Sequence, residues 1–217
     1  MNGHKTNKAG LLSRVSSIAI IAAASAFSAT QQAQAACVTT FNPGPSASVN
    51  VTSPVTCVII DDPVTGNVTN STQVGNPGTG FTPFSITANV GGQVINNGPI
   101  SGGYFNAGIQ RGALTISGDA TITGAIVNNN AITSSDGNGI QLGTGGENGA
   151  TILGGITNNN NIASGLRHGI AAIEGQLSGG LTNATDATIS GGLAGIFIAD
   201  TFGAWAGGID NAGQISG

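Results

Sequence analysis

A short phrase recurs five times from residue 91 onward, and this internal repeat constrains the fold more than any other feature. The phrase is an aliphatic residue, a variable residue and an asparagine, followed a few residues later by isoleucine and a small residue. Its asparagines, spaced 32, 30, 25 and 28 residues apart, are Asn96, Asn128, Asn158, Asn183 and Asn211. Periods of this length are typical of solenoids, in which each repeat forms one coil that packs on its neighbours.

The interior of each repeat has the pattern of short strands. Stretches such as 114–116 and 121–123 alternate aliphatic residues with threonine, as strands with one buried face do. A glycine–isoleucine pair, at 108–109, 139–140, 169–170 and 195–196, marks a further strand in each repeat. Glycine and asparagine between these stretches favour tight corners. We therefore expect an all-β fold, a right-handed parallel β-helix with three short strands per coil.

The recurring asparagines have a structural interpretation. Asparagine tolerates the left-handed conformation of corners, and stacked copies can pass side-chain hydrogen bonds from coil to coil. The runs 128–130 and 158–161 fall at the same place in consecutive repeats. We expect the five repeated asparagines to be structural corner residues.

The first residues have the pattern of a secretory signal peptide. Lys5, Lys8 and Arg14 precede an apolar run of about thirteen residues, which ends before the small-residue sequence 33–35. Cleavage is expected between Ala35 and Ala36. A spanning helix would need roughly twenty apolar residues. Lipid attachment at Cys37 is a minor alternative, because the residues before it lack the usual branched apolar side chain.

The predicted domains are a signal peptide (1–35), an N-terminal cap (36–60) and β-helix coils (61–217) that end in mid-repeat. Cys37 and Cys57 are the only cysteines. In an oxidising compartment we expect them to form a disulfide that closes a loop of about twenty residues and clamps the start of the fold. A metal or redox site there is disfavoured, because His168 is the only histidine after cleavage.

The charge balance excludes some partners. After cleavage two arginines remain against nine Asp and Glu residues, so the formal charge changes from -4 to 2 − 9 = -7, and no lysine is left. Nucleic acids and anionic lipids require clustered cations. We therefore expect no nucleic-acid partner and a soluble, exported protein.

Residues that could carry chemistry are few. No Ser-His-Asp set is apparent around His168, and the calcium-type nonapeptide 135–143 occurs only once, although that motif works in tandem. We expect no cofactor or metal. The alternative is a carbohydrate-active β-helix, a polysaccharide lyase or glycosidase, which would need carboxylates that share one face. The candidate carboxylates are Asp119, Asp136, Glu147, Glu174 and Asp186.

Aromatic residues gather near the C-terminus of the sequence. Phe197, Phe202 and Trp205 are candidate contact residues, since exposed aromatics commonly anchor partners. The competing interpretation is that Phe197 and Trp205 fill the core or stack on the next coil.

The signal peptide, the cysteine-bounded segment and the glycine- and asparagine-rich repeats, such as 154–159 and 207–217, together resemble the passenger region of a bacterial autotransporter. The resemblance covers nearly the whole chain. It implies export to the periplasm, passage across the outer membrane with a C-terminal β-barrel translocator, and display at the cell surface or release. Such a passenger would act without catalysis, as an adhesin or display scaffold for a host or surface glycan or protein ligand. The chain departs from the pattern in one respect, because no barrel strands follow Gly217.

Overall fold

A computed structural model of the 217-residue chain describes residues 38–39, 47–75, 82–106, 109–144, 149–199 and 205–217. All of these residues belong to one compact unit, Ala36–Gly217. The described residues form strands, turns and bends without a helix, so among them no helix is long and apolar enough to cross a membrane.

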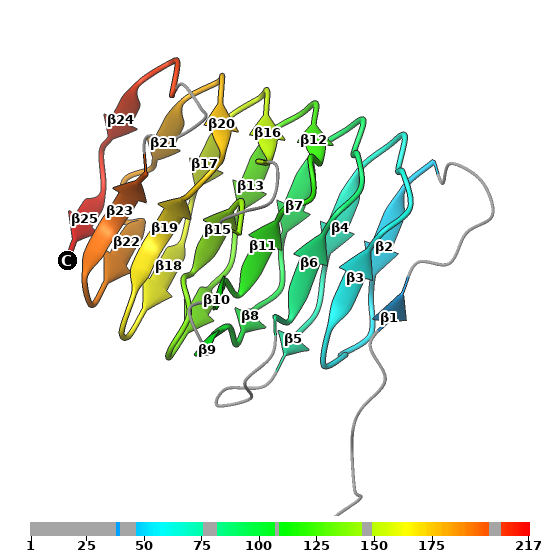
Figure 1. Cartoon of the computed structure of the whole chain (residues 1–217), viewed down its shortest axis with the longest axis horizontal. Coiled ribbons are helices and arrows are strands. Elements are labelled where there is room, and N and C mark those ends of the chain that lie inside the picture. The colour runs from blue at the N-terminus through cyan, green and yellow to red at the C-terminus, as the bar shows by residue number, and fades with distance from the viewer. Residues whose placement is uncertain (1–37, 40–46, 76–81, 107–108, 145–148, 200–204) are drawn as a thin grey trace, which may run out of the picture. The chain divides into compact units, whose positions relative to one another are not determined.

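The strands stack in parallel ladders, and each ladder is one side of a solenoid (Figure 1). Three ladders contain most of the strands. Sheet 1 contains β1 (Val38–Thr39), β3 (Val58–Ile60), β6 (Phe84–Ile86), β11 (Leu114–Ile116), β15 (Ile140–Leu142), β19 (His168–Ala172) and β23 (Ala194–Ile198). Sheet 2 contains β2 (Val49–Val51), β4 (Val68–Asn70), β7 (Val94–Asn96), β13 (Ile126–Asn128), β17 (Ile156–Asn158), β21 (Leu181–Asn183) and β24 (Ile209–Asn211). Sheet 3 contains β5 (Val74–Gly75), β8 (Ile100–Ser101), β14 (Ile132–Ser134), β18 (Asn161–Ser164), β22 (Thr188–Gly191) and β25 (Gln214–Ser216).

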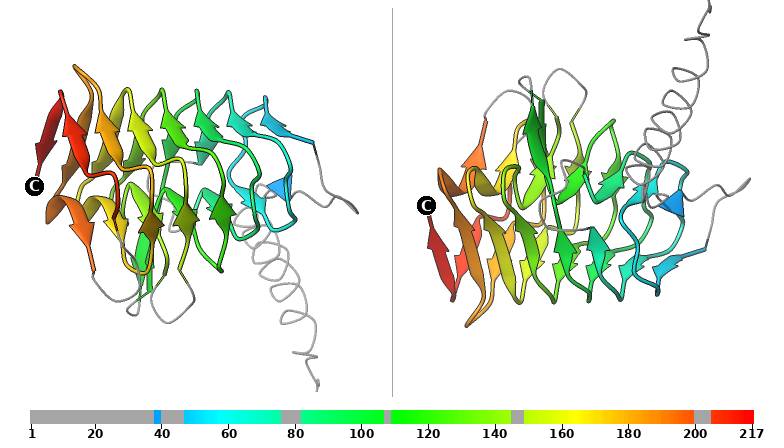
Figure 2. Two further views of the ribbon diagram at one scale, coloured as in Figure 1. Left: turned by 90° about the horizontal axis from the view of Figure 1, so that it is seen from above. Right: turned by 90° about the horizontal axis from the view of Figure 1, so that it is seen from below.

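A fourth, shorter ladder refines the expectation of three strands per coil. Sheet 4 contains β12 (Thr121–Ile122), β16 (Thr151–Ile152) and β20 (Gln176–Leu177), and isolated bridges at Val64, Val90 and Trp205 extend it. In each complete coil the chain passes through sheets 2, 3, 1 and 4 in that order. The expected parallel β-helix is confirmed, and Figure 2 shows its strands stacked in rows from two further sides.

The register of the ladders places the repeated phrase at the same position in successive coils. β13 pairs with β17 so that Ile126 lies opposite Ile156 and Asn128 opposite Asn158. Strands β2 and β3 lie inside the segment predicted as a cap, but they already pair in register with β4 and β6. The ladders therefore begin before residue 61.

One predicted alignment is wrong. The pair Gly108-Ile109 was expected to match Gly139-Ile140, but the strand opposite β15 is β11, with Leu114 paired to Ile140. The cause is an antiparallel pair, β9 (Tyr104–Asn106) and β10 (Ile109–Arg111), inserted between β8 and β11. Its base lies against the next coil, since a Cβ on Gly137 would approach the backbone nitrogen of Tyr104 to 2.6 Å.

The core is a narrow column of aliphatic side chains. Isoleucines that repeat from coil to coil are fully buried, among them Ile126, Ile132, Ile140, Ile152 and Ile162. Phe84 is the largest fully buried side chain in the described part of the chain. This packing follows from the period-two pattern of three-residue strands, whose outer residues point inward and whose central residue points outward.

Candidate functional site

The most continuous polar feature of the molecule is a column of asparagine side chains at the ends of the sheet 2 strands, which we call the inner ladder. Its members are Asn70, Asn96, Asn128, Asn158, Asn183 and Asn211. In each step the Nδ2 of one asparagine donates to the Oδ1 of the asparagine in the next coil, at 2.8 to 2.9 Å. The first five side chains are at most 2% exposed.

Backbone groups orient these amides. The Nδ2 of Asn70 also donates to the carbonyl of Gly98, and the Nδ2 of Asn183 also donates to the carbonyl of Gln214. On the other side of the amide, Oδ1 of Asn70 accepts the backbone N–H of Thr72. The first five side chains of the inner ladder therefore point their donors toward the C-terminal end of the stack.

A second column runs along the outside of the same corner, and we call it the outer ladder. Asn129 donates its side-chain amide to Oδ1 of Asn97, and Asn159 donates to Oδ1 of Asn129, both at 2.8 Å. These bonds point toward the N-terminal end, opposite to the inner ladder. The outer ladder does not continue in the next coil, where Ala184 follows Asn183.

The structure places the five predicted asparagines in one column and adds Asn70, which the sequence analysis did not select. Asn70 ends the phrase Val68-Thr69-Asn70, which has the aliphatic–x–asparagine form. That signal was present in the sequence, but it precedes the five phrases from which the repeat was defined.

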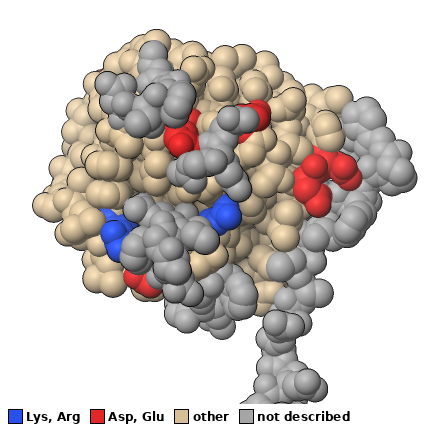
Figure 3. Space-filling view, in the orientation of Figure 1, with Lys and Arg blue, Asp and Glu red and all other residues tan. Residues whose placement is uncertain are grey.

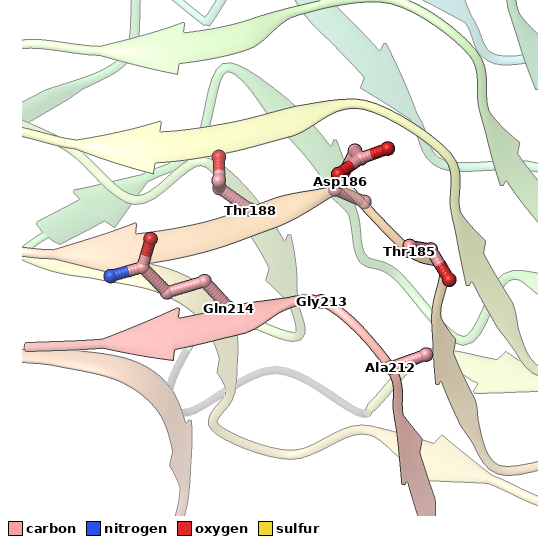
Figure 4. Close-up of a pocket in the computed structure, with 7 residues that line it drawn as sticks. Thr185, Asp186, Thr188, Ala212, Gly213 and Gln214 are labelled. Carbon is pink, nitrogen blue, oxygen red and sulfur yellow. The ribbon is translucent and has the colours of Figure 1, made fainter.

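The ladder corner changes shape near the C-terminal end of the stack. Two residues connect sheet 2 to sheet 3 in the neighbouring coils, such as Asn159-Asn160 and Ala212-Gly213, whereas four residues, Ala184 to Ala187, make this connection after β21. Asp186 adopts a positive φ of 65° in this longer corner. The bulge borders a hollow of about 300 Å³ (Figure 4). Its lining is Thr185, Asp186, Ala187, Thr188, Ala212, Gly213 and Gln214.

This hollow is polar and shallow. Thr185, Asp186 and Gln214 are exposed, and Figure 4 shows their side chains spread around the corner without converging on one point. Asp186 is the only carboxylate in the lining. Among the described residues, no group of three or more His, Cys, Asp or Glu side chains is placed to hold a metal ion.

The candidate carboxylates lie at several corners. Asp119 and Glu174 each come two residues before a sheet 4 strand, so they occupy the same corner in coils two steps apart. Asp136 lies between β14 and β15, at the other edge of sheet 1, and Asp186 lies at the ladder corner. Glu147 lies outside the described residues. Figure 3 shows acidic and basic side chains as separate spots on a largely uncharged face.

Of the two candidate aromatics that the structure describes, Phe197 is the exposed one. It is the fourth of the five residues of β23, opposite Ala171, and 39% of its surface is exposed. Its ring stacks on His168 of the previous coil, with centroids 4.5 Å apart and an interplanar angle of 11°. Trp205 is half-buried and packs against the core, beside Leu177. Phe202 lies outside the described residues.

His168 lies in an environment that perturbs its ionisation. The side chain is 9% exposed. Burial lowers the pKa of His168 below its ordinary value, and the positive charge of Arg167 lowers the pKa further, while a backbone hydrogen bond with Ala194 opposes both effects. At neutral pH the imidazole is therefore uncharged and stacks as an aromatic ring.

The remaining predicted residues lie at the start of the chain. Cys57 is buried, and it directly precedes β3. Cys37, Ala35 and Ala36 lie outside the described residues. The register pairs Val38 with Val58, the residues that follow Cys37 and Cys57 in the sequence. The disulfide and the cleavage site stay predictions.

Comparison with known proteins does not identify a relative. No family model matches the chain, and neither the curated proteins nor the solved structures contain a match to it.

Proposed function

We propose that the chain is a non-enzymatic, exported β-helix of the autotransporter-passenger type, which acts as an adhesin or display scaffold. The observation that carries the proposal is the inner ladder, in which six asparagines are joined by five side-chain hydrogen bonds from coil to coil. Buried polar side chains of an enzyme commonly converge on one pocket, whereas these are distributed evenly along the stack. A solenoid whose coils are joined in this way presents a long, uniform surface.

The proposed location is the periplasm in transit and then the cell surface or the medium, with a β-barrel translocator as the partner for outer-membrane passage. The signal-like residues 1–35 support export. The test is to express the full chain in a Gram-negative bacterium, fractionate the cells and sequence the N-terminus of the product. We expect a periplasmic product that begins at Ala36. An uncleaved cytoplasmic product would contradict export, and a lipid-modified Cys37 would favour the lipoprotein alternative.

The proposed ligand is a glycan or protein on another surface. Phe197 supports the proposal of such a ligand, because this large aromatic side chain stacks on His168 and is still 39% exposed. The test measures binding of the fluorescent chain to arrayed glycans and to host cells. We expect Phe197→Ala to weaken binding. Leu153→Ala is the matched control, since Leu153 is 45% exposed and directly follows β16 in sheet 4. Equal losses in both variants would contradict a role for Phe197.

A carbohydrate-active enzyme is the second candidate, and one observation favours it. Asp119 and Glu174 occupy the same corner two coils apart, and strands spaced by about 4.8 Å place the two positions about 10 Å apart along the stack. Carboxyl groups of inverting glycosidases lie about 6.5 to 9.5 Å apart, slightly less than this separation of the two backbone positions. Release of reducing sugar from a polysaccharide panel, abolished by both Asp119→Asn and Glu174→Gln, would establish this activity in place of the first proposal.

A further inference from the structure

The outer ladder begins at Asn97, and this residue differs from the other members of the ladder in two respects. Its Oδ1 accepts the side-chain amide of Asn129 at 2.8 Å, but no described residue accepts a hydrogen bond from its own Nδ2. In the previous coil Ser71 stands at the equivalent position, because Asn70 pairs with Asn96. The residue after Asn97 is a glycine, whereas an asparagine follows each of the other two members.

An asparagine followed by glycine can react with its own backbone. The backbone nitrogen of the glycine attacks Cγ of the asparagine side chain and closes a five-membered ring. Glycine permits this attack better than other residues, because it has no Cβ and a wide range of backbone angles. The described residues contain two such pairs, Asn97-Gly98 and Asn138-Gly139.

The structure protects one of these pairs and exposes the other. The side chain of Asn138 is completely buried. Its Oδ1 accepts the backbone N–H of His168 at 3.1 Å, and its Nδ2 donates to Oε1 of Gln141 at 2.9 Å. The side chain of Asn97 is exposed and is held by the single hydrogen bond from Asn129. Water therefore reaches the first pair only.

We propose that Asn97-Gly98 is a self-modification site, at which the folded chain converts Asn97 to a succinimide and then to aspartate or isoaspartate. A bond forms between the nitrogen of Gly98 and Cγ of Asn97, and the bond from Cγ to Nδ2 breaks. Nδ2 takes up the proton of the Gly98 N–H and leaves as ammonia. Water then opens the ring at either of its two carbonyl carbons. The proposal does not depend on the proposed function.

The hydrogen bond from Asn129 assists the ring closure. As the nitrogen of Gly98 adds to Cγ, negative charge develops on Oδ1 of Asn97. The Nδ2 of Asn129 already donates to this oxygen at 2.8 Å, and a donor that is in place before the attack stabilises the charge without reorganisation. The outer ladder thus activates the side chain with which it begins.

The two products affect the corner differently. Aspartate keeps an oxygen for the N–H of Asn129 and adds one negative charge, whereas isoaspartate places the side-chain methylene in the main chain. The corner has little room for this longer backbone. The N–H of Asn97 donates to the carbonyl of Asn70 at 2.7 Å, and the carbonyl of Gly98 accepts the Nδ2 of Asn70 at 3.1 Å. A Cβ on Gly98 would collide with the backbone of Thr72. Isoaspartate therefore disturbs the first step of the inner ladder.

The test incubates the folded full chain at neutral pH in heavy-oxygen water and follows both asparagine–glycine pairs by peptide mass spectrometry. The isotope marks the carboxylates that arise from hydrolysis of the ring. We expect conversion at Asn97 to be at least about tenfold faster than at Asn138, because a buried amide with two hydrogen bonds must open before the attack. In the chain unfolded in urea, the two rates should be similar. Equal rates in the folded chain, or no conversion at Asn97 while the unfolded chain converts, would overturn the proposal.

Asn129→Asp tests the assisting hydrogen bond. This variant keeps the size of the side chain and an oxygen that accepts from Asn159, but it has no N–H for Asn97. Conversion at Asn97 should be roughly two- to tenfold slower, the factor that corresponds to one hydrogen bond.

Asn130→Asp is the matched control for this variant. It adds the same charge at the same corner, but Asn130 donates to the backbone carbonyl of Asn97 and not to Oδ1. Its rate of conversion at Asn97 should equal that of the unaltered chain. Equal rates in the two variants would overturn the assisting role of Asn129.

Discussion

Asn128 donates its side-chain amide to Oδ1 of Asn158 at 2.8 Å, and both side chains are completely buried. Each buried amide in the middle of the inner ladder thus serves as donor to one neighbour and acceptor for the other. Because burial of an amide without partners is costly, the column is stable only when all members are present. It therefore holds the sheet 2 strands in register, since a one-residue slip would break every step.

The first prediction concerns this column. Asn128→Ala removes the acceptor of Asn96 and the donor to Asn158. The variant should lose about 2–4 kcal/mol of unfolding free energy, because two buried polar groups lose partners. Urea unfolding followed by circular dichroism measures the loss. Asn129→Ala is the control, since Asn129 belongs to the exposed outer ladder, and it should cost about 1 kcal/mol or less. Equal midpoints for the two variants would contradict the cooperative role of the inner ladder.

The repeat in the sequence was sufficient to predict the fold, because one local pattern determines each coil and neighbouring coils repeat it. The same pattern predicted which asparagines align, from spacing alone. It could not show that β9 and β10 interrupt one coil, since Gly108-Ile109 occurs at nearly the spacing of a true strand. The pattern also could not show which side chains of sheet 1 are buried and which are exposed. The exposure of Phe197 and the burial of His168 depend on contacts between coils.

The second prediction concerns the aliphatic column. Ile140 is completely buried between Leu114 and Ile170 in sheet 1. Ile140→Ala should lower the unfolding free energy by about 2–5 kcal/mol, because the narrow core cannot collapse to fill the cavity. Ile95→Ala is the matched control, as Ile95 is the outward, half-buried residue of β7, and its cost should be about 1 kcal/mol. A loss at Ile95 as large as that at Ile140 would mean that the outward row also forms a core.

The third prediction concerns the proposed disulfide. β1 and β3 pair in parallel register immediately after Cys37 and Cys57 in the sequence. Under oxidising conditions Cys57→Ser should lower stability by about 3 kcal/mol, the value expected for a closed loop of about twenty residues. Thermal unfolding with and without a reducing agent measures this effect. The variant should be insensitive to the reducing agent, and an unaltered chain that is equally insensitive would exclude the bond.

The fourth prediction concerns the pH dependence of stability through His168. Burial and the charge of Arg167 depress its pKa in the folded state, whereas the unfolded imidazole has a pKa of about 6.5. The unfolded state therefore binds more protons below this pH, so stability should be constant above about pH 6.5 and decrease as the pH falls toward the lower folded-state pKa. His168→Asn is the suitable variant, because Asn138 occupies the equivalent place two residues before Ile140 in the previous coil. Unfolding midpoints measured from pH 8 to pH 5 should decrease less in this variant than in the unaltered chain. Parallel profiles would show that the pH dependence comes from other groups and that the stack of His168 on Phe197 tolerates the charged imidazole.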